Sequence, residues 1–378
     1  MQRVVAHLAG EAVVRARGAE QLVECVLRQR LRHRVSPVST RARSVESAPA
    51  RAPSPPRNGS IRPVQRSAPT RSRVLTDGHA GNLRQARALA DALGLPTRST
   101  TLAPRAPWRW AAPRRLPGSE AAFGDALEGI DPATLAIGCG RQAALATRLL
   151  RERGVPAVQI LDPRIDPRHW DAVVVPEHDR LRGANVITLL GSLNPVGDAW
   201  LAAARAAFAE LGALPGPRTA LLVGGSTPHL RLGLREFERW LATVRHAIER
   251  DGGSVLATTS RRTPAAFVDA MRRRLAGLPG LVWTGSVDGR NPYAALLGWA
   301  DRIVCTADSV NMLSEAAATP APLYVAGTAG IRGRPGRFVQ ALAARGRIRA
   351  LDDTLTPFDV VPLRETARVA AQVRARLA

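Results

Sequence analysis

The strongest constraint on the fold of this 378-residue chain is a repeated alternation of short apolar runs with longer Ala/Leu/Arg segments. Short β-branched runs predict strands, and the longer segments predict helices. Strands that are apolar throughout, rather than at every second residue, are typical of parallel sheets covered on both faces. The predicted strands are 73–76, 134–138, 157–161, 172–176 and 186–190, then 219–223, 254–258, 281–283, 302–306 and 322–326.

Helices are predicted between these strands, at 82–93, 142–153, 198–211, 234–250, 263–275, 311–318 and 337–344. A Pro/Gly break at 214–217 divides the strands into two series. The pattern therefore predicts an α/β protein with two Rossmann-like domains that face each other across a cleft, at 73–213 and 214–362. A final amphipathic segment, 363–378, is expected to form a helix that could pack back across the junction.

The first 72 residues differ from the rest and are rich in Arg, Pro and Ser. Such a composition buries too little apolar area to offset the entropy of ordering, so we expect 1–72 to be a disordered basic extension. The first 73 residues hold 15 of the 54 basic residues and only four acids, which accounts for about half of the formal charge of +23. All 54 are Arg, a bias that points to bacterial genome composition. No recognised nucleic-acid module accompanies this charge, so no specific nucleic-acid partner is expected.

Cysteine usage and hydropathy indicate a cytoplasmic protein. Cys25, Cys139 and Cys305 are widely spaced and form no CxxC or Cys/His metal pattern, so buried reduced thiols and no metal are expected. No apolar run reaches the roughly 18 residues that a membrane-spanning helix needs. The expected location is the cytoplasm, with peripheral binding at the inner face of the membrane as a further option.

Ligands of open parallel sheets bind beyond the carboxyl ends of the strands, so residues that follow strands are the site candidates. The first strand runs into Asp77, Gly78, His79, Gly81 and Asn82. Asp77 and His79 are the predicted catalytic pair, as a base and its orienting partner. Gly78, Gly81 and Asn82 permit close approach of an acceptor to a helix N-terminus. A turn with a helix cap is the structural alternative.

Three further loops of the first half carry polar residues. Candidates for the acceptor or a secondary role are Arg141, Gln142, Asp162, Arg164, Glu177 and His178. A cation at the start of a helix opposes the helix dipole, so Arg141 suggests an anionic partner. For the loop with Asp162 and Arg164, a rigid turn is the favoured interpretation. The Glu177-His178 pair lacks the second histidine set that a metal site would need.

The second half contains three loops suited to a nucleotide diphosphate. Small residues and hydroxyls beside helix starts can bind phosphates, and a carboxylate two turns along a helix can accept both ribose hydroxyls. The predicted nucleotide site comprises Gly224, Gly225, Ser226, Thr259, Ser260, Arg261, Asp308, Ser309 and Glu315. Helix capping alone would also explain Asp308 and Ser309.

Several motifs together resemble the mitochondrial-fission Elm family. They include the residues around Asp77 and Gly81, the segments 137–142, 159–164 and 175–180, and the loops at Gly224, 258–262 and 306–316. The resemblance covers about 73–378 and implies an architecture like that of GT-B nucleotide-sugar glycosyltransferases. Plant members are known as fission factors that recruit a dynamin-related protein to mitochondria. In glycosyltransferases of this architecture a Gly-rich, His-containing loop follows the first strand, and the pattern around His79 differs from it.

Two functions follow from these expectations. The first is a metal-independent glycosyltransferase that binds a nucleotide diphosphate-sugar in the C-terminal domain and needs no cofactor. Its acceptor would be lipid-linked or lie at a membrane surface. The second is a non-catalytic adaptor or binding protein on the same scaffold, with a protein partner. A cleft filled by the protein's own side chains would favour the adaptor.

Overall fold

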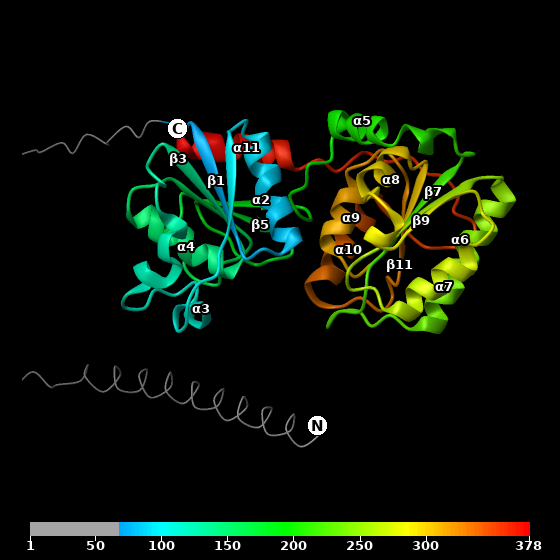
Figure 1. Cartoon of the computed structure of the whole chain (residues 1–378), viewed down its shortest axis with the longest axis horizontal. Helices are drawn as coiled ribbons and strands as arrows, with labels where there is room; N and C mark the ends of the chain where they lie inside the picture. Colours follow the sequence, from blue (N-terminus) through cyan, green and yellow to red (C-terminus); the bar gives the residue numbers. More distant parts are fainter. Residues whose placement is uncertain (1–67) are drawn as a thin grey trace, which may run out of the picture. The chain divides into compact units, whose positions relative to one another are not determined.

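The computed structural model describes residues 68–378, so most of the predicted extension at 1–72, including Cys25, lies outside the described residues. Within this range the chain forms two six-stranded parallel sheets (Figure 1). The first sheet has the order β2-β1-β3-β4-β5-β6 and the second the order β12-β11-β10-β7-β8-β9. Two Rossmann-like α/β halves, as predicted, are therefore present.

The first sheet has four inner strands that are mostly buried and two edge strands, β2 and β6, that are more exposed. The six strands are β1 (Arg71–Thr76), β2 (Thr97–Thr101), β3 (Thr134–Cys139), β4 (Ala157–Ile160), β5 (Ala172–Pro176) and β6 (Val186–Leu189). One face packs on α2 (Ala80–Ala92) and on the C-terminal helix α11 (Thr366–Leu377), with Val74, Leu89 and Val373 in one apolar cluster. The other face packs on α4 (Arg141–Glu152) and the 3-10 segment η1 (Ser119–Leu127). The sheet is thus covered on both faces, which explains its uninterrupted apolar strands.

The second sheet consists of β7 (Arg218–Val223), β8 (Ser254–Thr259), β9 (Gly280–Trp283), β10 (Arg302–Thr306), β11 (Leu323–Ala326) and β12 (Ile348–Ala350). Its helices are α6 (Leu234–Asp251), α7 (Ala265–Leu275), α8 (Tyr293–Trp299), α9 (Val310–Ala317) and α10 (Gly333–Ala344). Helix α5 (Asp198–Ala207) also packs on this half, against α8, and contributes Leu201 to its core. The remaining short elements are α3 (Trp108–Ala111), η2 (Pro167–His169), η3 (Ala209–Ala213) and η4 (Ser286–Asp288).

The strands β2 and β12 were not predicted from the sequence. In addition, β1 begins at Arg71, two residues before the predicted start. The strand β2 has the sequence TRSTT and is partly exposed at the edge of its sheet, so it shows no apolar run. The other, β12, has only three residues and also lies at an edge. The predicted domain limits at 213/214 and 362/363 stay predictions.

The strand orders locate the position where ligands are expected. In each sheet the chain starts in the middle and winds outward in both directions, so the order reverses between β1 and β3 and between β7 and β10. Loops diverge at such a reversal and leave a crevice at the carboxyl ends of the strands. The loops after β1, β3, β7 and β10 carry part of the predicted site residues, and the others follow β4, β5 and β8.

Candidate functional site

A pocket of about 600 Å³ lies at the carboxyl edge of the first sheet. The first turns of α2, which follows β1, line it together with the residues that follow β3, β4, β5 and β6, the N-terminal end of α9 and the start of α10. Its volume is in the range of small-molecule sites. The lining residues are Asn82, Gln85, Gly140, Arg141, Leu161, Asp162, Pro163, Arg164, Pro176, His178, Asp179, Ser192, Val310, Asn311, Arg334 and Pro335.

The loop after β1 is organised around the Asp77 carboxylate. Asp77 accepts hydrogen bonds from Asn82 Nδ2 at 3.0 Å and from the backbone N–H of His79 at 3.2 Å. Burial alone would raise the pKa of Asp77, but these hydrogen bonds and the imidazole of His79 hold it below its ordinary value. The His79 side chain is 79% exposed and lies 3.1 Å from Asp77. Neither member of the predicted catalytic pair lines the pocket, whereas Asn82 does.

The loop after β3 brings a helix start to the pocket. Gly140 precedes α4 with a φ of 95°, and a Cβ there would lie 2.9 Å from Asn82 Nδ2, so this position requires glycine. Arg141 lines the pocket, but its guanidinium donates to the backbone oxygens of Trp110 at 3.0 Å and Ala112 at 3.3 Å. Arg141 thus has a structural role that the sequence did not reveal, and its anionic partner stays a prediction.

The loops after β4 and β5 supply charged residues. Asp162 accepts from the backbone N–H of Arg164 at 2.8 Å, which forms the predicted rigid turn, and the Arg164 side chain is 67% exposed. His178 lies beside Asp179 in the pocket, while Glu177 points elsewhere and pairs with Arg345 at 3.3 Å. Gln142, Gly78 and Gly81 are likewise outside the lining.

Three buried polar atoms of residues that line this pocket have no hydrogen-bond partner among residues 68–378. They are Nδ1 of His178, Oδ1 of Asp179 and Oγ of Ser192. Burial lowers the pKa of His178 and outweighs the opposing effect of Asp179, so its imidazole is held neutral. The Asp179 carboxylate lies 3.1 Å from Arg334 Nε, as an ion pair without hydrogen-bond geometry. Buried polar groups are normally paired, so these atoms mark a place for a ligand or water.

Sequence reasoning did not place Ser192, Asn311 or Arg334 in the site. Ser192 follows the last strand of the first sheet, which is a positional signal of the kind used for the other loops. Arg334 lies at the start of α10, far along the chain, and only the tertiary fold shows that it reaches Asp179.

The predicted nucleotide loops of the second sheet do converge, but they fill the space between them with their own groups. Asp308 has a fully buried side chain and accepts from the backbone N–H of Gly225 at 3.1 Å and from Arg262 Nη2 at 2.8 Å. A Cβ on Gly224 would lie 2.0 Å from the Asp308 carboxylate, and one on Gly225 would lie 2.3 Å from the Arg262 carbonyl oxygen. These glycines therefore allow the loops to pack together.

The hydroxyls of these loops are also engaged locally. Ser226 accepts from the Leu232 N–H, Thr259 donates to the Thr284 carbonyl and Ser260 accepts from the Arg262 N–H. Ser309 caps α9 by accepting from Met312 N–H at 3.4 Å, as its position before the helix predicted. The side chain of Arg261, by contrast, makes no hydrogen bond or ion pair with any other described residue.

Glu315, the predicted ribose ligand, is already occupied. Its side chain is 3% exposed and accepts from Arg84 Nη1 at 2.7 Å and from the Tyr293 hydroxyl at 2.5 Å. Burial, followed by the charge of Glu315, raises the pKa of Tyr293 well above its ordinary value, so the phenol keeps its proton. In this structure Glu315 joins α2 to α8 and α9 and offers no free oxygen to a ribose.

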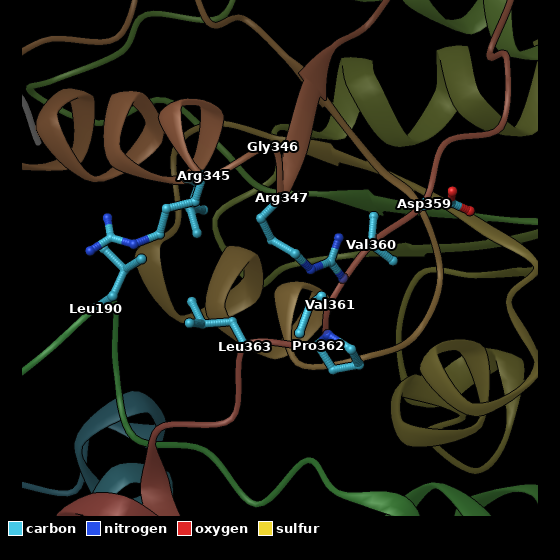
Figure 2. Close-up of a pocket in the computed structure, with 10 residues that line it drawn as sticks. Leu190, Arg345, Gly346, Arg347, Asp359, Val360, Val361, Pro362 and Leu363 are labelled. Carbon is cyan, nitrogen blue, oxygen red and sulfur yellow. The ribbon is translucent and has the colours of Figure 1, made fainter.

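A second pocket, of about 410 Å³, lies beside the segment 359–363 (Figure 2). Arg345 and Arg347 extend in opposite directions there, and Arg347 reaches toward Val360. The Arg347 guanidinium is buried and donates to four backbone oxygens, those of Ala316, Ala317, Thr319 and Ala321. Burial lowers the pKa of Arg347 to about 10, and its role is to cap the C-terminal end of α9.

Fold and site together define a two-sheet, Rossmann-type α/β protein with a polar pocket at the carboxyl edge. The chain belongs to the mitochondrial fission ELM1 family, whose sequence model matches residues 80–377. This confirms the resemblance drawn from the motifs.

Two curated proteins illustrate the relationship. The chain is 29% identical over 279 residues to the mitochondrial fission protein ELM1 of Arabidopsis thaliana, a match that covers 66% of this chain and 65% of the relative. It is 22% identical over 283 residues to an uncharacterised protein of Rickettsia prowazekii, covering 64% of this chain and 79% of that one. The match thus spans slightly less than two thirds of the plant protein.

Similarity to solved structures is distant. The Methanocaldococcus jannaschii UDP-GlcNAc 2-epimerase in complex with UDP-GlcNAc and UDP has 11% identity and a TM-score of 0.46, covering 80% of this chain and 99% of that one. The S. aureus MnaA–UDP co-structure has 10% identity and a TM-score of 0.44, covering 81% and 90%. Acinetobacter baumannii MurG has 14% identity and a TM-score of 0.40, covering 82% and 91%.

Proposed function

We propose that this chain binds a nucleoside diphosphate or nucleotide sugar at the carboxyl edge of the first sheet, with the diphosphate at the N-terminal end of α9. The observation that carries this proposal is the pocket itself. It gathers the N-terminal ends of α4 and α9, at Gly140 and Asn311, with the guanidinium groups of Arg164 and Arg334. Helix N-termini and arginine side chains both favour phosphate oxygens.

The unpartnered polar atoms support the same ligand. Ser192 Oγ can donate to a phosphate or sugar oxygen, and His178 Nδ1 can accept from a sugar or acceptor hydroxyl. Arg261, the arginine predicted to bind the nucleotide, is exposed on the loop after β8 and does not line this pocket. Glu315 could bind ribose in this proposal only after Arg84 leaves it.

For glycosyl transfer without a metal, we assign the removal of the acceptor's proton to His178. It lines the pocket and burial keeps it neutral, which suits a general base. The developing charge on the leaving diphosphate would be stabilised by Arg334 and the α9 N-terminus. If Asp77 or His79 serves instead, replacing His178 with Asn should leave the pH dependence of transfer unchanged.

A thermal-shift screen of the full chain against nucleoside diphosphates and nucleotide sugars tests the proposal and identifies the preferred nucleobase. Stabilisation by nucleotides of one nucleobase, lost in Arg334→Gln, supports the proposal. No stabilisation by any nucleotide at millimolar concentration contradicts it.

One observation favours a second candidate, a non-catalytic adaptor. Glu315 and Asp308 are both satisfied by the protein's own groups, so part of the predicted nucleotide site is filled. The Arabidopsis relative is named as a mitochondrial fission protein. For an adaptor we expect a protein whose two α/β halves are folded but which binds no nucleotide.

A further inference from the structure

An exposed aromatic residue stands out in the segment 102–118, which follows β2. Trp110, on the short helix α3, is 60% exposed. The other large apolar side chains that are exposed among residues 68–378 are aliphatic, namely Leu234, Val287 and Val361. Helix α3 lies on a loop that projects from the first sheet and its helices (Figure 1). An exposed indole on a projecting loop indicates a surface that meets something other than water.

The charged residues of the segment that contains Trp110 are all arginines. The segment 102–118 contains four arginines and no acidic residue. Arg115 is paired with Glu120 and Glu152. The side chains of Arg105, Arg109 and Arg114 are exposed, and none makes a hydrogen bond or ion pair with another described residue. Three guanidinium groups without a partner among residues 68–378 and one exposed indole, that of Trp110, thus share a short loop.

The backbone of this loop is held in place by hydrogen bonds from two side chains, those of Arg141 on α4 and of Trp108 in the loop itself. Arg141 donates to the carbonyl oxygens of Arg109 and Trp110 at 3.4 and 3.0 Å, and Trp108 Nε1 donates to that of Pro117 at 3.0 Å. Because the loop is already ordered, little conformational entropy is lost when its outer side chains bind a surface. Arg141 also lines the candidate pocket, so it links the loop to that pocket.

We propose that the segment 102–118 docks this protein on an anionic phospholipid bilayer. Trp110 would lie at the level of the headgroups, where indole rings are favoured, and Arg105, Arg109 and Arg114 would contact lipid phosphates. A nucleic-acid surface is less well matched, because a single exposed indole offers no series of stacking platforms. Docking here would place the pocket beside the membrane, and it does not depend on nucleotide binding.

Vesicle flotation of the full chain tests the proposal. We expect binding to vesicles of phosphatidylcholine with phosphatidylglycerol, weaker binding at high salt, and none to phosphatidylcholine alone. Arg109→Gln should weaken binding about fivefold, which corresponds to one basic residue near an anionic surface, and Trp110→Ser by a similar factor or more. The tryptophan fluorescence should shift to the blue on binding in the wild type and shift less in Trp110→Ser.

Two matched controls address other surfaces. Val287→Ser removes a 90% exposed apolar side chain, and Arg235→Gln removes an exposed arginine of α6, so both should bind vesicles as the wild type does. Equal binding by Trp110→Ser, Arg109→Gln and the controls would show that another part of the chain, such as the basic residues 1–67, binds lipid, and would overturn the proposal. Absence of vesicle binding would also overturn it, as would a loop that instead binds nucleic acid or a second copy of the chain.

Discussion

Arg84 Nη1 lies 2.7 Å from Glu315 Oε1, although the two residues are 231 positions apart in the chain. Arg84 belongs to α2, which packs on the first sheet, and Glu315 belongs to α9, which packs on the second. The ion pair therefore connects the helices of the two sheets directly. Tyr293 adds a hydrogen bond to the same carboxylate, and the Arg84 guanidinium lies 5.3 Å from the Tyr293 ring centre.

Replacing Arg84 with Met should destabilise the protein, because it leaves the buried Glu315 carboxylate with only the Tyr293 hydroxyl. Breaking a buried ion pair typically costs several kcal/mol, but the Arg84 side chain is 46% exposed and solvent screens part of this. We expect a loss of about 1–3 kcal/mol in the free energy of unfolding, measured in urea.

Arg87→Met is the matched control for this prediction. Arg87 lies on the same helix and bonds only the Ser99 hydroxyl on the exposed surface, so little change is expected. In addition, Arg84→Met should reduce the free energy of unfolding less in a Glu315→Gln background, because the negative charge that Arg84 balances is then absent. Equal costs in both backgrounds would contradict the pairing.

Gly225→Ala should destabilise the half of the protein that contains the second sheet. The new Cβ would lie 2.3 Å from the Arg262 carbonyl oxygen, which is a backbone atom. Overpacking of this kind costs about 1–3 kcal/mol. Gly285→Ala is the control, since its φ of 166° is extended backbone that any residue adopts and no atom lies within 4 Å of an added Cβ. It should change the free energy of unfolding by about 0.5 kcal/mol or less. Similar thermal midpoints for the two variants would show that the loops after β7 and β8 do not pack as described.

Arg347→Met should cost about 2–4 kcal/mol, because methionine fills the space but leaves four buried carbonyl oxygens without their donor. Arg345 lies two residues earlier and its side chain is exposed, so Arg345→Met should lower the free energy of unfolding much less. Denaturant unfolding of the two variants measures the difference. A neutral Arg347→Met variant would mean that the C-terminal end of α9 does not depend on this cap.

Asp251 provides a pH-dependent prediction. Hydrogen bonds from Arg250 and Arg302 lower the pKa of Asp251 below 3.8, against a smaller raising effect of burial. The carboxylate therefore stabilises the fold above pH 3.8, and this stabilisation is lost as the pH falls through the lower folded-state pKa. Asp251→Asn should cost about 1–3 kcal/mol at pH 7, where it leaves the buried Arg302 without its charged partner. Urea unfolding should show the two proteins converging below about pH 4, and a constant gap down to pH 3 would contradict this assignment.

The sheets could be predicted largely because their inner strands are apolar throughout. Ala172–Pro176 and Arg302–Thr306, for example, are buried along their whole length, so both appear as strands in the sequence. The edge strand Thr97–Thr101 was missed because its polar side chains face solvent. Because β1, β3 and β5 are parallel strands of one sheet, Asn82, Arg141 and His178, which follow them, lie at the same edge and line one pocket, as their positions after strands suggested.

Pairing across the chain could not be predicted in the same way. Glu315 was interpreted as a free ribose ligand because nothing near it in the sequence indicates that Arg84 reaches it. The same is true of Arg334, which meets Asp179, and of Arg262, which balances Asp308 although its neighbour Arg261 was the predicted ligand. Such contacts depend on the packing of whole elements, which local periodicity does not encode.

Calorimetric titration of the full chain with the nucleotide selected by thermal shift, in the wild type and in Arg334→Gln, tests the central claim most directly. The account predicts saturable binding by the wild type, about tenfold or more weaker in Arg334→Gln because a charged contact to phosphate is lost, and unchanged in Arg235→Gln on the exposed face of α6. Equal affinity of the wild type and Arg334→Gln would place the nucleotide elsewhere. No binding heat at millimolar nucleotide would contradict the nucleotide site and favour the adaptor.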